Sequence, residues 1–385
     1  MPALAGKTYF NYGGQGPLPA PSLDAIVSSW REIQELGPFT EAVWPHISGT
    51  TGTLRNRLAA WCGVGQQRLA LTENVTTGCT LPLWGLPWQP GDELLISDCE
   101  HPGVVASCQE LARREQLTPT SLPLHSLCCG TGESERDGSV LDALEQSLTP
   151  RTRLVVLSHL LWNTGAVMPI AQVAGRLANH PRRPWLLVDA AQSMGSLPLG
   201  DAAEASDIYA FTGHKWCCGP EGLGGVALSE RLLEQGSPTL IGWRTLSRES
   251  DAASGFHHDA RRFEVATSCT PLQAGLNTSL QLLEAEGSAA SRLETIRRRS
   301  RQLWLGMQEI SGLRTLLPEP PPAGLVSFVL EGRGETAEVV ARLGAQGLWI
   351  RSLSGPPCLR ACTHITTTEE EVELLLGALT SLPRR

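Results

Sequence analysis

The stretch at 209–222, YAFTGHKWCCGPEG, holds one lysine and two adjacent cysteines, residue types that can bond covalently to substrates or cofactors. Lys215 follows an apolar run and precedes Trp216, so the sequence predicts an amine at the edge of a buried sheet. Desolvation there would lower the pKa of the ammonium toward that of a reactive amine, which can form a Schiff base. Thr212 and His214 are placed to contact an anion beside this amine.

The eleven cysteines include no CxxC pair and no cysteine and histidine spacing of the zinc type. We therefore expect neither a disulfide framework nor a metal site. Free cysteine is among the most buried residue types, so the sequence favours packing as the role of Cys217 and Cys218.

Two segments with polar side chains follow short apolar runs. ENVTTG at 73–78 opens a helix, so its N–H groups and the hydroxyls of Thr76 and Thr77 could hold a phosphate; ordinary helix capping is the alternative. SDCEHPG at 97–103 presents His101, whose ring could stack on an aromatic cofactor or play a structural part.

Two further segments carry an amide or a carboxylate. SHLLWNTG at 158–165 supplies Asn163, and LVDAAQSMG at 187–195 supplies Asp189 and Gln192. A carboxylate at the end of a buried strand points into the crevice at the sheet edge, where it could hold a ring nitrogen protonated. For Asp189 the alternative is a helix cap.

The elements that position these residues follow an α/β pattern. Between residues 68 and 227, segments of helical spacing separate the apolar runs RLALT, DELLIS, RLVVLSH, WLLVDAA, DIYAFT and LGGVAL, which are typical of buried parallel strands. Sites of such sheets lie beyond the carboxyl ends of the strands, so we expect function there. From about residue 270, long helical patterns and two candidate strands, GLVSFVL and GLWIRS, predict a smaller C-terminal domain.

The composition argues against several partners. A formal charge of −8 and a pI of about 5.7 give no general attraction to polyanions, so we expect no nucleic-acid and no membrane partner. The sequence starts without a signal peptide and has no apolar run of the roughly 18 residues that a membrane span needs. We therefore expect a cytoplasmic protein.

Taken in order, these residues resemble the class V aminotransferase family of pyridoxal-phosphate enzymes, which includes the cysteine desulfurases. The resemblance rests on Asp189, Gln192, Thr212, Gly213, His214, Lys215, Gly219 and Pro220. Within the family the sequence is most similar to the cyanobacterial C–S lyases of L-cysteine and L-cystine. The matching segments span nearly the whole chain and are KTYFNYGGQGPLP, ENVTTGC, SDCEHPG, LSHLLWNTG, AFTGHKW, RRFEVATS and LRACTHI.

The resemblance implies an α/β protein of the aspartate aminotransferase-like fold type I. It implies a large cofactor-binding domain at 15–257, with a mostly parallel sheet. A smaller α+β domain at 258–385 would include the N-terminal residues 1–14. The resemblance further implies a homodimer with a shared active site.

It also implies the cofactor, pyridoxal 5'-phosphate, and the residues that hold it. Lys215 would bond to the cofactor and act as the catalytic base, and His101, also catalytic, would stack on the ring. Asp189 would pair with the pyridine nitrogen, and Gln192 would donate to the phenolic oxygen.

The remaining site residues are implied in the same way. Around the phosphate the resemblance places Thr76, Thr77, Thr212, His214 and, from the neighbouring subunit, Thr267. The substrate carboxylate would be bound by Arg360, with Arg351 and Asn163 assisting.

The implied activity is β-elimination on L-cystine and L-cysteine. The products would be pyruvate, ammonia and either cysteine persulfide or sulfide, with sulfur supply for iron–sulfur clusters as the cellular role and the sulfur acceptor left open. A cysteine desulfurase using an enzyme persulfide on Cys358 is the alternative. Such enzymes carry this cysteine on a long mobile loop, whereas Cys358 stands two positions before Arg360. A non-catalytic member of the family is a further alternative, which the complete set of site residues argues against.

Overall fold

The computed structural model describes residues 1–383, which form three sheets. The strands are β1 (Thr8–Tyr9), β2 (Leu69–Thr72), β3 (Glu93–Ser97), β4 (Thr118–Leu122), β5 (Thr152–Ser158), β6 (Trp185–Asp189), β7 (Ile208–Thr212), β8 (Gly224–Leu228), β9 (Leu313–Thr315), β10 (Leu325–Leu330), β11 (Leu348–Trp349), β12 (Arg351–Ser354) and β13 (Pro357–Cys362).

Helices surround these sheets. The α-helices are α1 (Ala20–Leu36), α2 (Val43–Cys62), α3 (Val75–Trp84), α4 (Pro102–Glu115), α5 (His125–Gly130), α6 (Glu133–Ser147), α7 (Ile170–Ala178), α8 (Gly200–Ala205), α9 (Glu230–Gln235), α10 (Thr270–Ala285), α11 (Ala289–Gln308), α12 (Thr336–Gly344) and α13 (Glu369–Ser381). Short 3-10 helices span Pro2–Leu4, Gln66–Arg68, Trp243–Thr245, Ala252–Ser254 and Ala260–Phe263. None of the helices in the described chain combines the length and apolar character that a membrane span needs.

The large sheet has seven strands in the order β2-β8-β7-β6-β5-β3-β4. Its pairs are parallel from β7 to β4, whereas β8 runs antiparallel to both of its neighbours. All six apolar runs of the sequence form strands of this sheet, and the predicted α/β class is confirmed. The edge strand β4 was missed because its sequence, TPTSL, is mostly exposed and has no apolar run.

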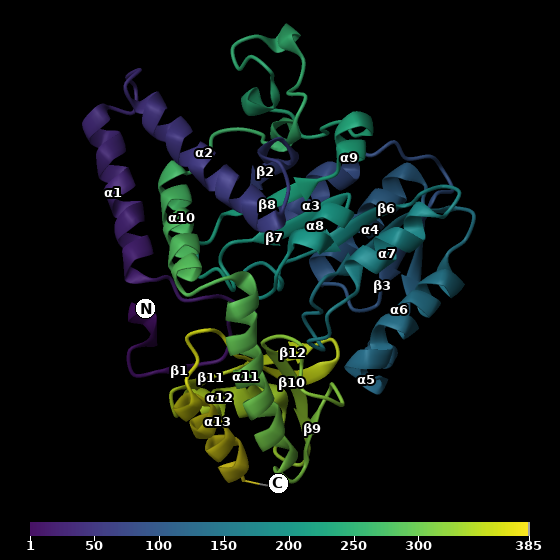
Figure 1. Ribbon diagram of the computed structural model, residues 1–385, viewed down its shortest axis with the longest axis vertical. Helices are drawn as coiled ribbons and strands as arrows, with labels where there is room; N and C mark the ends of the chain where they lie inside the picture. Colours follow the sequence, from purple (N-terminus) through teal and green to yellow (C-terminus); the bar gives the residue numbers. More distant parts are fainter. Residues whose placement is uncertain (384–385) are drawn as a thin grey trace.

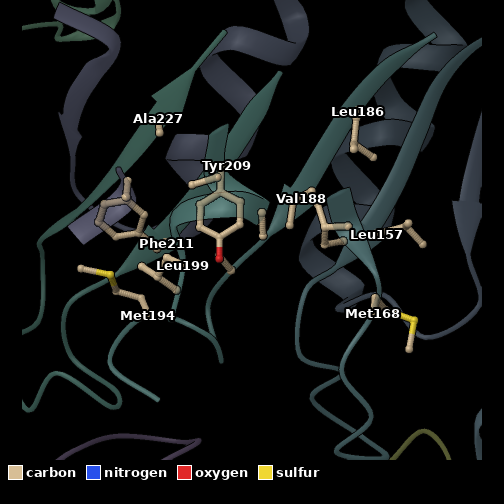
Figure 2. Close-up of a cluster of buried hydrophobic side chains, with 14 of the residues drawn as sticks. Leu157, Met168, Leu186, Val188, Met194, Leu199, Tyr209, Phe211 and Ala227 are labelled. Atoms are coloured by element: carbon tan, nitrogen blue, oxygen red, sulfur yellow. The ribbon is translucent and has the colours of Figure 1, made fainter. Parts of the chain in front are cut away.

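Successive residues of the large sheet join apolar clusters on opposite faces. Leu157, Val188 and Tyr209 belong to the cluster drawn in Figure 2, whereas their neighbours Val156 and Leu187 belong to a second one. Because both faces are covered, the central strands carry apolar side chains in both directions. This double burial is why they appear in the sequence as continuous apolar runs.

A second, smaller body lies below the large sheet in Figure 1. It has a four-stranded antiparallel sheet of order β12-β13-β10-β9, and helices α11, α12 and α13 share an apolar core with this sheet. The N-terminal strand β1 pairs in parallel with β11, so the start of the chain joins this body. The predicted strand at 347–352 is two strands, β11 and β12, and β13 was not predicted.

Helix α10 falls within the predicted small domain but packs with the larger body. It lies against α1 and α2, as Figure 1 shows for α1, and its Leu276, Leu280 and Leu283 belong to the same apolar cluster as Leu157 and Tyr209. We therefore propose that the small domain begins after α10 rather than at residue 258. The end of the predicted small domain, residues 384–385, lies outside the described residues.

Candidate active site

Four predicted site residues follow neighbouring strands of the large sheet. Asp189 ends β6, Lys215 comes three residues after β7, and His101 and Asn163 follow β3 and β5. Because these strands are parallel, their carboxyl ends meet at one edge of the sheet. The fold therefore brings residues from four separate segments to one place.

Lys215 is a partly buried amine. Burial lowers the pKa of its ammonium group to about 8, and the negative charge of Asp189 opposes this change. The positive charges of Arg360 and Arg351 lower the pKa further. A substantial share of Lys215 is therefore neutral near physiological pH and available as a nucleophile or base.

Asp189 is a buried carboxyl whose Oδ1 accepts a hydrogen bond from the N–H of Ala191 at 2.8 Å. Burial raises its pKa, while that hydrogen bond and the charges of Lys215 and His101 oppose the change. It forms no ion pair within residues 1–383, and Ala191 lies in a turn, not at a helix start. A cationic N–H group of a ligand would supply the missing partner.

Gln192 has both ends of its buried amide engaged. Nε2 donates to the carbonyl of Gly13 at 2.9 Å, and Oε1 accepts from the indole Nε1 of Trp216 at 2.9 Å. The contact with Gly13 joins the N-terminal segment to the edge of the large sheet.

His101 caps the N-terminus of α4. Its Nδ1 accepts from the N–H of Gly103 at 3.2 Å, and its ring lies edge-on to Trp162 with centroids 5.6 Å apart. Burial, together with the charge of Lys215, lowers the pKa of His101. The ring is therefore neutral at physiological pH, which suits stacking on a flat ligand better than proton donation.

Helix α3 packs against β7, and the Cα atoms of Asn74 and Thr212 would both lie 3.2 Å from a Cβ at Gly224. Asn74 caps this helix: its Oδ1 accepts from the N–H of Thr77 at 2.9 Å and from its hydroxyl at 3.2 Å. The exposed Thr76 adds a second hydroxyl, and on β7 the Oγ1 of Thr212 lies 2.7 Å from Nδ1 of His214. Free N–H groups at a helix start and clustered hydroxyls favour an anion.

Arg360, in the middle of β13, is 2% exposed. Its Nη1 donates to the carbonyl of Trp162 at 2.8 Å, whereas its Nε is buried without a partner and no ion pair forms within residues 1–383. Arg351 stands opposite it on β12 and is exposed. A buried guanidinium without an acid requires an anion, and its geometry fits a carboxylate.

Asn163 and Thr267 differ in their surroundings. Asn163 is buried, and its Oδ1 accepts from the N–H of Thr164 at 2.9 Å. Thr267 is exposed, just before α10, and takes part in none of the contacts described above. The contacts of the described residues therefore do not join Thr267 to the rest of the site.

Sequence reasoning missed Glu100, which immediately precedes His101. Its buried carboxylate accepts from the N–H and the hydroxyl of Ser158 at 2.8 and 2.7 Å, so it anchors the His101 turn to the end of β5. Burial raises its pKa to about 7, and the charge of Asp189 acts in the same direction. An acid three residues after a strand, beside a site histidine, was the available signal.

Cys358 is a fully buried thiol in β13 that packs with Leu316 and Leu353. Burial raises its pKa to about 11, so it is protonated at neutral pH. It stands one residue beyond a tight hairpin in which Ser354 pairs with Pro357. All eleven cysteines are free thiols; Cys217 and Cys218 are buried, as expected for packing residues.

Comparison with known proteins adds independent findings. The family model described as Aminotransferase class-V matches residues 46–375. Isopenicillin N epimerase from Amycolatopsis lactamdurans is 30% identical, over 98% of this chain and 95% of that protein. A probable cysteine desulfurase from Pseudomonas aeruginosa is 29% identical, over 98% of this chain and 94% of that protein. The cystine C-S lyase C-DES, solved in complex with its reaction product cysteine persulfide, is 41% identical with a TM-score of 0.93, over 99% of both chains.

Proposed function

Since the chain belongs to the class-V aminotransferase family, we propose that it is a pyridoxal 5'-phosphate-dependent C–S lyase that performs β-elimination on L-cystine. The products are pyruvate, ammonia and cysteine persulfide, and L-cysteine is the second substrate, which gives sulfide. The observation that carries this proposal is the buried guanidinium of Arg360, which forms no ion pair within residues 1–383 and whose positive charge helps to lower the pKa of the Lys215 amine. The likeness to C-DES supports the choice of sulfur chemistry.

The site residues fit this cofactor. Asp189 is a buried carboxylate that forms no ion pair within residues 1–383, which suits a protonated ring nitrogen. Lys215 offers an amine of lowered pKa for a covalent bond to an aldehyde. The start of α3, with Thr76, Thr77, Thr212 and His214 around it, suits a phosphate.

When bound, pyridoxal 5'-phosphate supplies an electron-withdrawing ring that accepts the electron pair left at the substrate Cα. Arg360 binds the substrate carboxylate, assisted by Arg351 and Asn163, and so fixes the Cα–H bond relative to Lys215. The substrate amine would take the place of Lys215 on the cofactor, and the freed, neutral Nζ of Lys215 would then remove the Cα proton. Asp189 would favour the protonated form of the ring nitrogen, and the neutral His101 would stack on the ring and exclude water.

Departure of the β-sulfur from Cβ completes the elimination, and water then hydrolyses the released three-carbon enamine to pyruvate and ammonia. One cystine and one water then give one pyruvate, one ammonia and one cysteine persulfide. A persulfide has a lower pKa than hydrogen sulfide and is the better leaving group, so the disulfide substrate is favoured over L-cysteine.

The buried state of Cys358 disfavours the alternative, a cysteine desulfurase. An enzyme persulfide needs an accessible thiolate, whereas this thiol is fully buried and has a raised pKa. The tight turn between β12 and β13 gives it no long loop on which to reach the substrate.

We further propose a homodimer in the cytoplasm, in which Thr267 reaches the phosphate of the neighbouring subunit. Its exposure just before α10 is compatible with this role. Exposed apolar side chains on α1 and α2, Leu23, Trp30 and Trp44, offer surface for a second copy. The persulfide product would supply sulfur for iron–sulfur clusters through an acceptor.

A cofactor and substrate test addresses this proposal. Protein loaded with pyridoxal 5'-phosphate should show a visible absorbance band that Lys215→Ala abolishes. At equal concentrations, pyruvate should form faster from L-cystine than from L-cysteine. Faster turnover of L-cysteine would contradict the substrate assignment, and absence of the band would contradict the cofactor assignment.

A further inference from the structure

Trp216, directly after Lys215, is a fully buried indole beside the site. Its N–H is its only polar atom, and it donates to Oε1 of Gln192 at 2.9 Å. An indole can donate but not accept, so the amide oxygen, rather than the nitrogen, must face it. The other end of the amide, Nε2, then donates to the carbonyl of Gly13 at 2.9 Å and has one hydrogen left over.

The indole is held rigidly enough to impose this orientation. Tyr12 stacks against it with ring centroids 6.4 Å apart and an interplanar angle of 29°. The imidazole Nε2 of His364 lies 3.1 Å from the Trp216 carbonyl, and a Cβ at Gly324 would lie only 2.8 Å from the ring. Groups from the N-terminal segment and from the small body therefore fix the ring in place.

We propose that Trp216 is a positioning residue whose indole N–H fixes the Gln192 amide so that this side chain can only donate toward the bound cofactor. The inference rests on the proposed function, because the cofactor supplies the acceptor. A donor at this position stabilises an anionic phenolic oxygen, whereas a rotated amide would place its own oxygen against that charge. Trp216 thereby tunes the cofactor without touching the reacting atoms.

The test uses loaded holoenzyme and Trp216→Phe, which keeps an aromatic ring and removes the N–H. We expect the dissociation constant of pyridoxal 5'-phosphate to rise about fivefold, the value of one neutral hydrogen bond. The pH midpoint of the visible absorbance should rise by about half a unit or more. Trp185→Phe is the matched control, because the Trp185 indole is also buried and its N–H has no hydrogen-bond partner among residues 1–383; it should change neither value.

A double-mutant cycle separates positioning from packing. In a Gln192→Ala background, Trp216→Phe should change neither the dissociation constant nor the midpoint. Equal changes in both backgrounds, or none in the native background, would overturn the inference. If Trp216→Phe does not fold, the indole ¹⁵N–H spectra of the native protein and of Gln192→Ala test the contact instead. One indole N–H that exchanges slowly with solvent in the native protein should exchange fast in Gln192→Ala. Unchanged exchange of every indole N–H would refute the contact. Failure of the native chain to bind the cofactor would instead refute the proposed function.

Discussion

The guanidinium of Arg360 donates from Nη1 to the carbonyl of Trp162 at 2.8 Å, although the two residues come from different bodies of the molecule. Arg360 lies on β13 of the small sheet, and Trp162 lies in the turn after β5 of the large sheet. The ring of Trp162 in turn contacts His101 edge-on. The guanidinium that we propose for the substrate carboxylate is therefore held between the two bodies, so its distance from Lys215 depends on how they pack.

Arg360→Lys should lower kcat/KM for L-cystine by about 100-fold, because a bidentate charged contact is replaced by a point charge and the carbonyl of Trp162 loses its donor. Arg351→Lys is the matched control on the paired strand. Since Arg351 is exposed, Arg351→Lys should lower kcat/KM for L-cystine by about tenfold or less. Steady-state kinetics of both variants would check this, and a larger effect at Arg351 would contradict the assignment.

Lys215→Met should stabilise the cofactor-free protein at pH 7 by roughly 1–3 kcal/mol. The folded-state pKa of about 8 lies below the unfolded value, so the unfolded chain binds more protons between pH 8 and about 10.5. Native stability relative to Lys215→Met should therefore rise across this window and level off below it. Urea unfolding at several pH values measures the difference in free energy of unfolding between Lys215→Met and the native protein. A difference that does not become smaller as the pH rises would count against a buried amine.

Glu100→Gln should remove a fall in stability between about pH 4.5 and 7. Because the folded-state pKa is raised to about 7, the folded protein binds more protons than the unfolded chain in this range. The native protein should lose up to about 3 kcal/mol relative to Glu100→Gln as the pH rises through it. If the two proteins differ in free energy of unfolding by the same amount at every pH, the Glu100 carboxyl is not desolvated.

Cys358→Ala should leave pyruvate formation within about twofold of the native rate, since the protonated, buried thiol takes no part in the chemistry. In the native holoenzyme, Cys358 should also resist alkylation under conditions that modify the partly exposed Cys129 and Cys269. A pyruvate assay measures the first result, and peptide mass spectrometry of the alkylated protein measures the second. Loss of pyruvate with a gain of alanine would restore the desulfurase alternative.

The sequence predicts much of the large sheet because its strands are buried on both faces, which leaves a plain apolar signal. Asp189, Lys215, His101 and Asn163 could be located because each follows such a run. The edge strand β4 and the strand β13 lack that signal; β13 carries the charged Arg360 in its centre. Their places depend on pairing with distant segments, which local pattern does not encode.

The contacts that complete the site are also long-range. Gly13 reaches Gln192 across 179 positions of the chain, and Trp162 reaches Arg360 across 198. No local spacing indicates such pairs. The packing of α10 against α1 escaped prediction for the same reason, and this packing is why we propose a later division between the two bodies.

The most direct test of the central claim is the product balance of the loaded native enzyme with L-cystine. We predict one pyruvate, one ammonia and one cysteine persulfide for each cystine consumed, unchanged in Cys358→Ala. Alanine as the main product, with a persulfide on the enzyme, would contradict the C–S lyase assignment, as would recovery of cystine that is only epimerised.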